Sequence, residues 1–402
     1  MIAMHDTLAK HRDRLFGTDE SFAAETLRAL GRGTNPALAE KSTHALEYVA
    51  QLKAQGMSFV FVGGTAAQLL LAGGVSRLSK DVDVIAPDSS ADDWRRAVAA
   101  IAGRFGGEVY QATEEQRDHG GLTIPAIHFL IAYPTVFPSK AVADIALDVV
   151  LAPVRFPTQE TTLATHYYTT KEPVAATTPT VEALFGGKLT TLGPGTIGIP
   201  REKANFDLTT GKQLFDLSHL LAHVRDLEVV AQAYRAAYEQ QRTYHAEGKR
   251  PTLEAVLDDA LYALKLLAAP PGVKGPGELW ASDLAALSQA AVKLRGYVGD
   301  KEGFDRLGAR RAAGEVALAL VFVHKALLDG LPPQEAQARW LAHLARITDQ
   351  GRDQEALADA RARVQQVPWA ERPHINIREF VTAVGPEALL YWDAVFAELS
   401  TS

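Results

Sequence analysis

The sequence contains no cysteine, only three methionines and no long uninterrupted run of apolar residues. Without cysteine, disulfide bonds and cysteine-ligated zinc or iron–sulfur sites are excluded. A membrane-spanning helix needs about 18 or more consecutive apolar residues, and no segment approaches that length. Residues 1–17 carry charges every few positions instead of the apolar stretch of a secretory signal, so we expect a cytoplasmic protein.

The sequence also lacks an excess of positive charge. It has 41 lysines and arginines against 48 aspartates and glutamates, which gives a net charge of −7. This balance argues against a protein that coats nucleic acid through bulk electrostatics, although a local basic groove is compatible with it. At 402 residues and 47% hydrophobic, the chain can bury a large core and is expected to form two or three domains.

Three regions of different periodicity follow one another along the chain. Residues 1–56 have apolar side chains three and four positions apart, which predicts an N-terminal helical segment whose main helix begins after Asn35. Residues 57–157 alternate short β-rich runs with a helix that Ser89 or Ser90 can cap. Residues 158–402 begin with a threonine-rich connector and continue with helical periodicity.

These patterns predict an α/β core over residues 57–157, with a small mixed sheet flanked by helices. An all-helical C-terminal domain should follow from about residue 180 to the end. The expected strands are the runs MSFVFV, DVDVIA, PAIHFLIAY and ALDVVLA. His128, within the third run, is expected to be a structural strand residue and not a catalytic base.

A Gly-Gly-Thr turn follows the first of these strands. Gly63 and Gly64 leave backbone amides uncovered, and Thr65 can begin the next helix. Backbone amides at a helix N-terminus bind anions, so this turn is suited to phosphate oxygens.

The second strand opens with alternating carboxylates. Side chains alternate along a strand, so Asp81 and Asp83 should project to one side while Val82 and Val84 face the core. Two carboxylates on one face make a hard-oxygen site suited to Mg²⁺. Taken singly, a Gly-Gly turn or an Asp-x-Asp sequence is more often structural, whereas their succession favours a functional site.

A third carboxylate from a neighbouring strand would complete a two-metal site for phosphoryl transfer. Asp148, which apolar residues flank in ALDVVLA, is the best candidate, and Asp144 is the alternative.

This order of motifs resembles the polymerase-β-type nucleotidyltransferase superfamily and, more narrowly, the AbiEii/MenA-type nucleotidyltransferase toxins. The resemblance spans roughly residues 57–220. It rests on Gly63-Gly64-Thr65, Arg77-Leu78-Ser79-Lys80-Asp81-Val82-Asp83, the strand acid Asp148, Lys188 in LFGGKLTTL and Asp216 in KQLFDLSHLL.

The resemblance implies an enzyme that moves a nucleoside monophosphate from a nucleoside triphosphate (NTP) to an acceptor hydroxyl, as a toxin of a toxin–antitoxin or phage-defence system. It implies that Asp81, Asp83 and Asp148 bind Mg²⁺ or Mn²⁺, and that Asp148 also orients or deprotonates the acceptor. Lys188 would face the triphosphate and Asp216 would complete the catalytic residues, with residues 180–225 completing the cleft. The implied nucleotide-binding residues are Gly63, Gly64, Thr65, Arg77, Ser79 and Lys188.

The acceptor implied by the resemblance is the 3′ end of tRNA, and the implied protein partner is a cognate antitoxin. A local positive rim for RNA would come from Arg77, Lys80, Arg201 and Lys203. Transfer to a protein or a small molecule is an alternative that the negative net charge keeps open, and a catalytically inactive nucleotide-binding module is another. From the residues alone, Lys188 and Asp216 could instead lie on exposed helix faces, an alternative that has more weight for Asp216 than for Lys188.

Overall fold

The computed structural model describes residues 7–30, 35–71, 77–137, 142–270, 273, 277–298, 304–351, 353–366 and 384–400. The chain forms two compact units. The first comprises residues 1–180, 244–246 and 296–302, and the second comprises residues 181–243, 247–295 and 303–402. None of the helices in the described ranges is long and apolar enough to cross a membrane.

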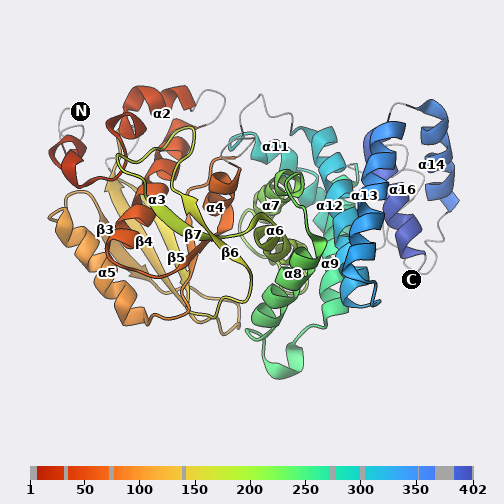
Figure 1. Ribbon diagram of the computed structural model, residues 1–402, viewed down its shortest axis with the longest axis horizontal. Helices are drawn as coiled ribbons and strands as arrows, with labels where there is room; N and C mark the ends of the chain where they lie inside the picture. The colour runs from red at the N-terminus through yellow and green to blue at the C-terminus, as the bar shows by residue number, and fades with distance from the viewer. Residues whose placement is uncertain are drawn as a thin grey trace. The chain divides into compact units, whose positions relative to one another are not determined.

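The first unit is built on a five-stranded mixed sheet with the strand order β1-β2-β5-β4-β3 (Figure 1). The strands β2 and β5 are parallel, and the other neighbours are antiparallel. The mixed α/β organisation expected for this region is therefore confirmed. The strands are β1 (Val60–Val62), β2 (Val82–Ile85), β3 (Gln111–Glu115), β4 (Ala126–Pro134) and β5 (Val142–Val150).

The edge strand β3 was not among the expected strands. Its sequence is QATEE, and its first four residues are exposed. A strand at the edge of a sheet needs no buried apolar face, so the alternation that marks the other strands is missing.

One face of the sheet forms the core of the first unit. Its side chains come from alternate positions of the central strands, and they are at most 1% exposed at Val82, Val84, Leu147 and Val149. The helices α3 (Pro36–Ala54) and α5 (Ala91–Arg104) cover this face and belong to the same hydrophobic cluster (Figure 1). The opposite face of β2 and β5 is only partly buried.

The helix α3 begins and ends at the expected residues. The Asn35 side chain accepts a hydrogen bond from the Ala37 amide at 3.0 Å, and Pro36 occupies the first helical position. The chain leaves the helix through Gly56, whose φ of +75° suits glycine. The residues 1–56 that contain this helix belong to the first unit.

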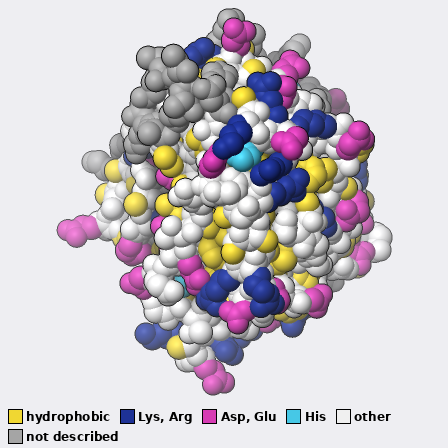
Figure 2. All heavy atoms as spheres, turned by 90° about the vertical axis from the view of Figure 1, so that its left-hand side faces the viewer, with side chains coloured by type: hydrophobic (Ala, Val, Ile, Leu, Met, Phe, Trp, Pro, Cys, Tyr) yellow, Lys and Arg dark blue, Asp and Glu magenta, His cyan; other side chains and the backbone are white. Residues whose placement is uncertain are grey.

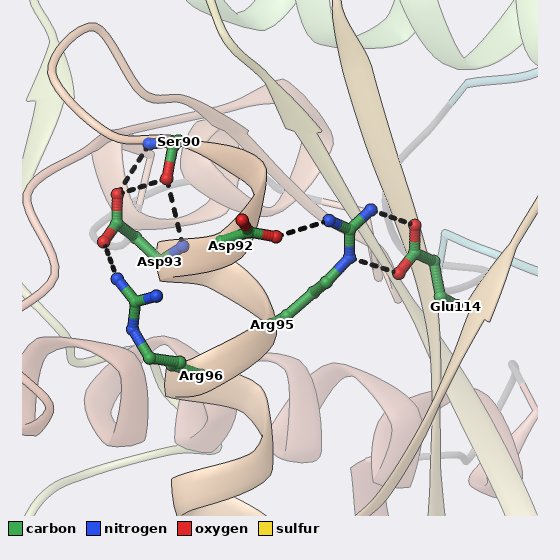
Figure 3. A network of polar contacts seen from close by, with 6 residues as sticks. All are labelled: Ser90, Asp92, Asp93, Arg95, Arg96 and Glu114. Carbon is green, nitrogen blue, oxygen red and sulfur yellow. Dashed lines mark hydrogen bonds and ion pairs between the residues drawn. The ribbon is translucent and has the colours of Figure 1, made fainter.

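Ser90 caps α5 in a reciprocal capping box with Asp93 (Figure 3). The Asp93 amide donates to Ser90 Oγ at 3.3 Å, and the Ser90 amide donates to Asp93 Oδ2 at 2.8 Å. From the next turn, Arg95 makes two hydrogen bonds of 2.8 Å to Glu114 of β3. This pair joins α5 to the polar edge strand.

The connector after the core contains a second, small sheet. Strands β6 (Thr158–Thr162) and β7 (Ala175–Pro179) pair in antiparallel fashion. The threonine-rich sequence was expected to be a plain connector. Threonine is β-branched, however, and fits a strand whose side chains are half exposed.

The described part of the second unit consists of helices and contains no strand. The helix α12 (Arg306–Leu327) packs against α7, α8, α9, α13 and α16. The helices are α6 (Val181–Leu189), α7 (Phe206–Leu221), α8 (Leu227–Arg242), α9 (Leu253–Ala268), α10 (Gly277–Leu287), α11 (Ala290–Leu294), α12, α13 (Pro333–Gln350), α14 (Gln354–Gln366) and α16 (Pro386–Leu399).

A buried carboxylate on α3 joins distant segments of the first unit. Glu47 is fully buried, and its Oε1 and Oε2 atoms accept the amides of Phe16 and Gly17 at 3.0 and 2.8 Å. The Tyr168 hydroxyl donates to Oε2 at 3.0 Å, and Gln51 donates to Oε1 at 2.7 Å. Burial raises the pKa of Glu47, and these hydrogen bonds act in the opposite direction.

We expect Glu47→Gln to lower the free energy of unfolding by about 1–3 kcal/mol. The glutamine amide group would face backbone donors that need an acceptor, so at least one buried N–H would lose its partner. Urea unfolding followed by circular dichroism measures the change.

Glu172→Gln is the matched control, because Glu172 is exposed. It should leave the unfolding midpoint unchanged. Equal midpoints for the two variants would show that the Glu47 hydrogen bonds do not stabilise the fold.

Candidate functional site

Strand pairing aligns four polar residues across the sheet of the first unit. Asp83 of β2 pairs with Asp148 of β5, Asp148 with His128 of β4, and His128 with Glu115 of β3. Directly paired residues on neighbouring strands point to the same face. These four residues, here called the polar row, therefore lie on the face opposite the buried core.

Asp81 lies one residue before β2 and is partly exposed, as is Asp83. Val82 and Val84 between and after them are buried. The expected alternation of carboxylates and core valines is thus confirmed. Thr65 Oγ1 donates to the Asp81 carbonyl oxygen at 2.6 Å, which ties the start of α4 (Gly63–Leu70) to the start of β2.

The Gly63-Gly64 turn is shaped by the residues that face it. Gly63 has φ +78°, and a Cβ atom at this position would lie 2.1 Å from Asp83 Oδ2. A Cβ atom at Gly64 would lie 2.5 Å from Arg77 Nη2 and 2.6 Å from Ser79 Oγ. The structure therefore brings the two glycines together with Asp83, Arg77 and Ser79.

The N-terminus of α4 has no side-chain cap, and its preceding residue is Val62. The first amides of a helix have no partner within the helix and carry the positive end of its dipole. This terminus, beside Arg77 and Ser79, is suited to bind an anion such as phosphate.

The segment 77–79 is held firmly in the first unit. Arg77 and Ser79 are 5% and 7% exposed. The Gln68 side chain donates to the Arg77 carbonyl oxygen at 2.7 Å, and Ser42 Oγ donates to the Ser79 carbonyl oxygen. The backbone of this segment is therefore fixed by side chains of α4 and α3.

Asp148 is surrounded by cationic and imidazole groups. Arg117 Nη1 donates to both carboxylate oxygens, at 2.8 and 2.9 Å, and His128 Nδ1 lies 2.9 Å from Oδ1. His119 Nε2 is 3.3 Å from His128 Nε2. Desolvation opposes the charge on Arg117, but the attraction of Asp148 and Glu115 outweighs it and raises the arginine pKa.

Sequence reasoning did not find Arg117 or His119, and it treated His128 as structural. The contacts of Arg117 and His128 with Asp148, and of His119 with His128, follow from the pairing of β4 with β5 and from the loop after β3. Neither feature has a signal in the local sequence pattern. Once the register is known, His128 opposite Asp148 is the residue that signals the cluster.

The polar row offers the oxygen ligands that divalent cations prefer. Asp83 and Asp148 are neighbours by strand pairing, so their carboxylates are suited to share an ion. Within the described ranges, however, no three His, Asp or Glu side chains are grouped so as to hold a metal. Asp148 instead contacts Arg117, and Asp144, the alternative, pairs with Lys41 at 3.2 Å.

Two other candidate residues meet within the second unit. Lys188 Nζ of α6 lies 2.9 Å from Asp216 Oδ2 of α7 and 3.0 Å from Gln213 Oε1. Lys188 and Asp216 are 5% and 2% exposed. Neither residue lies on an exposed helix face, so the alternative that they are solvated surface residues is excluded.

Arg201 also makes a structural contact in the second unit. Its Nε donates to Asp283 Oδ2 at 2.9 Å, and Asp283 is 3% exposed. Nearby, Asp259 accepts the Gly195 amide at 2.7 Å, and burial raises the pKa of this aspartate. The long loop between α6 and α7 is therefore anchored by two carboxylates.

One face of the molecule carries charge of both signs (Figure 2). Figure 2 shows a face on which lysine and arginine side chains lie among aspartates and glutamates. Exposed ion pairs of the first unit, such as Lys10–Glu108 and Arg96–Asp93, likewise place a basic side chain beside an acidic one. This face has the pattern of a solvated surface and not of a broad nucleic-acid-binding one.

A family model described as nucleotidyl transferase AbiEii toxin, type IV TA system, matches residues 44–366. The match covers most of the chain and includes every candidate residue from Gly63 to Asp216. No curated protein matches the chain.

We expect Gly63→Ala to lower the free energy of unfolding by at least about 1–2 kcal/mol, since the left-handed conformation disfavours a Cβ atom. The added methyl group would also displace the Asp83 carboxylate. Thermal unfolding measures the loss of stability.

Gly103→Ala is the matched control, because Gly103 lies in α5 and a Cβ atom there meets nothing within 4 Å. It should be neutral or stabilising by up to about 1 kcal/mol. A loss of stability as large as that of Gly63→Ala would contradict the specific role of the turn.

Proposed function

We propose, because this chain belongs to the AbiEii nucleotidyl transferase toxin family of type IV toxin–antitoxin systems, that it transfers a nucleoside monophosphate from an NTP to the 3′ hydroxyl of tRNA. The observation that carries the proposal is the close approach of Gly63 to Asp83, which places the glycine turn beside the polar row. A phosphate-binding turn next to paired carboxylates is the arrangement that phosphoryl transfer needs.

In the proposed reaction the acceptor hydroxyl oxygen attacks the α-phosphorus of the NTP. The bond between the α-phosphorus and the bridging oxygen breaks, and pyrophosphate leaves with its electron pair. Asp148 would accept the proton of the acceptor hydroxyl, since a carboxylate within reach of a hydroxyl acts as a general base.

Asp81, Asp83 and Asp148 are the residues that would hold Mg²⁺ or Mn²⁺. Such an ion supplies positive charge that stabilises the oxygens of the attacking and leaving groups. Support comes from the oxygen ligands on one face of β2 and β5 and from the strand pairing of Asp83 with Asp148.

The triphosphate would be bound by the amides at the start of α4 together with Arg77 and Ser79. The close approach of both side chains to Gly64 supports this assignment. Lys188, paired with Asp216, is proposed as a further triphosphate ligand, since an ammonium group offsets charge that develops on pyrophosphate.

The tRNA acceptor and an antitoxin partner are proposed from the family relationship. The net charge of −7 implies that a small number of basic residues would contact RNA phosphates. Of the expected rim, Lys80 is partly exposed and Lys203 exposed, whereas Arg77 is buried and Arg201 pairs with Asp283.

The direct test incubates the protein with Mg²⁺, each α-labelled NTP and purified tRNA, and follows the label on a denaturing gel. The tRNA should be labelled, and tRNA with an oxidised 3′ end should not. Equal labelling of both RNAs would exclude the 3′ hydroxyl, and label on protein or a small molecule instead would identify a different acceptor.

Asp83→Asn should reduce labelling at least about a hundredfold, because it removes the negative charge of one ligand of the proposed metal site. The exposed Asp88→Asn, on the same segment, is the control and should keep wild-type activity. Wild-type labelling by the Asp83 variant would overturn the mechanism.

Lys188→Met alone would remove the ammonium group that pairs with the buried Asp216 carboxylate, and breaking a buried ion pair on one side costs about 3–5 kcal/mol. The double variant Lys188→Met/Asp216→Asn removes both charges and should regain most of that stability, as unfolding curves can show. Both variants should label tRNA at least about tenfold more slowly. A stable double variant with a wild-type rate would assign the pair a purely structural role.

A further inference from the structure

Arg117 contacts the carboxylate that the proposed function assigns to metal binding. Its guanidinium donates to both oxygens of Asp148, and a second nitrogen lies 3.3 Å from Glu115. His128 approaches Asp148 Oδ1 at 2.9 Å. Both oxygens of this carboxylate therefore already have partners.

We propose that Arg117 is an internal cation that holds Asp148 in the metal-free protein and is displaced when a divalent ion binds. The inference rests on the proposed function. In this proposal Arg117 is a positioning residue that sets the affinity of the site for the divalent ion.

The charges of the polar row explain why such a cation is needed. Asp83, Asp148 and Glu115 place three carboxylates along one row of paired strands. Like charges at such spacing repel, and a neighbouring cation offsets the repulsion. Arg117 contacts two of the three, so it balances this charge without a bound ion.

A divalent ion that binds Asp148 through both oxygens competes directly with the guanidinium. Arg117 Nη1 lies within 2.9 Å of both oxygens, so it holds the position that such an ion would take. Two cations on one carboxylate also repel each other strongly in a partly desolvated site. Binding of the ion through both oxygens therefore displaces Arg117.

The position of Arg117 makes this release feasible without a change in the sheet. It lies two residues beyond the end of β3, in the loop that leads to β4. This loop turns through Gly120 and Gly121, which have φ of +64° and +81°. Only the arginine side chain, which is one-third exposed, has to move.

The test measures Mn²⁺ binding to the full-length protein without nucleotide, by electron paramagnetic resonance of the free ion. Arg117→Gln should lower the dissociation constant about five- to tenfold, since it removes a competing ion pair of ordinary strength. Arg117→Lys keeps the charge but has no second nitrogen for Glu115, so its dissociation constant should lie between those of the wild type and the glutamine variant.

The matched control is Arg95→Gln. Arg95 makes a two-point pair with Glu114, one residue before Glu115, as Figure 3 shows. This substitution removes the same charge from the same edge of the sheet and should leave Mn²⁺ binding unchanged. If Arg95→Gln and Arg117→Gln lower the Mn²⁺ dissociation constant equally, the change in net charge would explain the effect. That result would overturn the proposal.

Asp83→Asn separates this inference from the proposed function. If wild-type Mn²⁺ binding does not depend on Asp83, the proposed metal site fails. If binding depends on Asp83 but Arg117→Gln binds Mn²⁺ no more tightly than the wild type, only the role of Arg117 fails. Circular dichroism checks folding, and if the glutamine variant does not fold, an unchanged affinity of Arg117→Lys overturns the proposal.

Discussion

The parallel pairing of β2 with β5 is the interaction on which the site depends. The two strands are more than fifty residues apart in the chain, and their register sets Asp83 opposite Asp148. A shift of one residue would turn Asp83 toward the core and expose Val82, because side chains alternate along a strand. Burial of the valines therefore fixes the place of the carboxylates. The antiparallel neighbour β4 then adds His128 to the same row.

The buried core lies on the face of the sheet opposite the site, and it also contains polar groups. On α3, Glu47 is satisfied by two backbone amides and a tyrosine hydroxyl, and Glu40 accepts the Val136 amide at 2.7 Å and the Thr135 hydroxyl. Each of these carboxylates joins the helix to segments that hydrophobic packing alone would leave without defined hydrogen-bond partners. The buried acids thus add defined hydrogen bonds to the hydrophobic packing of α3, whereas the acids of the open face lie in the polar row.

Most of the fold that positions the site could be predicted from local patterns. The alternation at residues 81–84, the caps of α3 and α5 and the helical period after residue 180 are all signals of the chain itself. The strand β3 could not be predicted, because its residues are polar and exposed. Arg117 could not be connected with Asp148 either, since that contact depends on strand order and on a loop. Burial of Lys188 and Asp216 likewise depends on tertiary packing, and only the family resemblance directed attention to them.

The contact between Gly63 and Asp83 has an evolutionary consequence. A side chain at position 63 collides with the carboxylate at position 83, so the fitness effect of a substitution at one site depends on the residue at the other. Loss of the acid would remove this collision but not the strain of a side chain at φ +78°. Glycine is therefore demanded twice at this position, once by the backbone and once by the carboxylate. A lineage that lost the acid would still be under pressure to keep the glycine, so the two residues are expected to be lost in a fixed order, with the acid first.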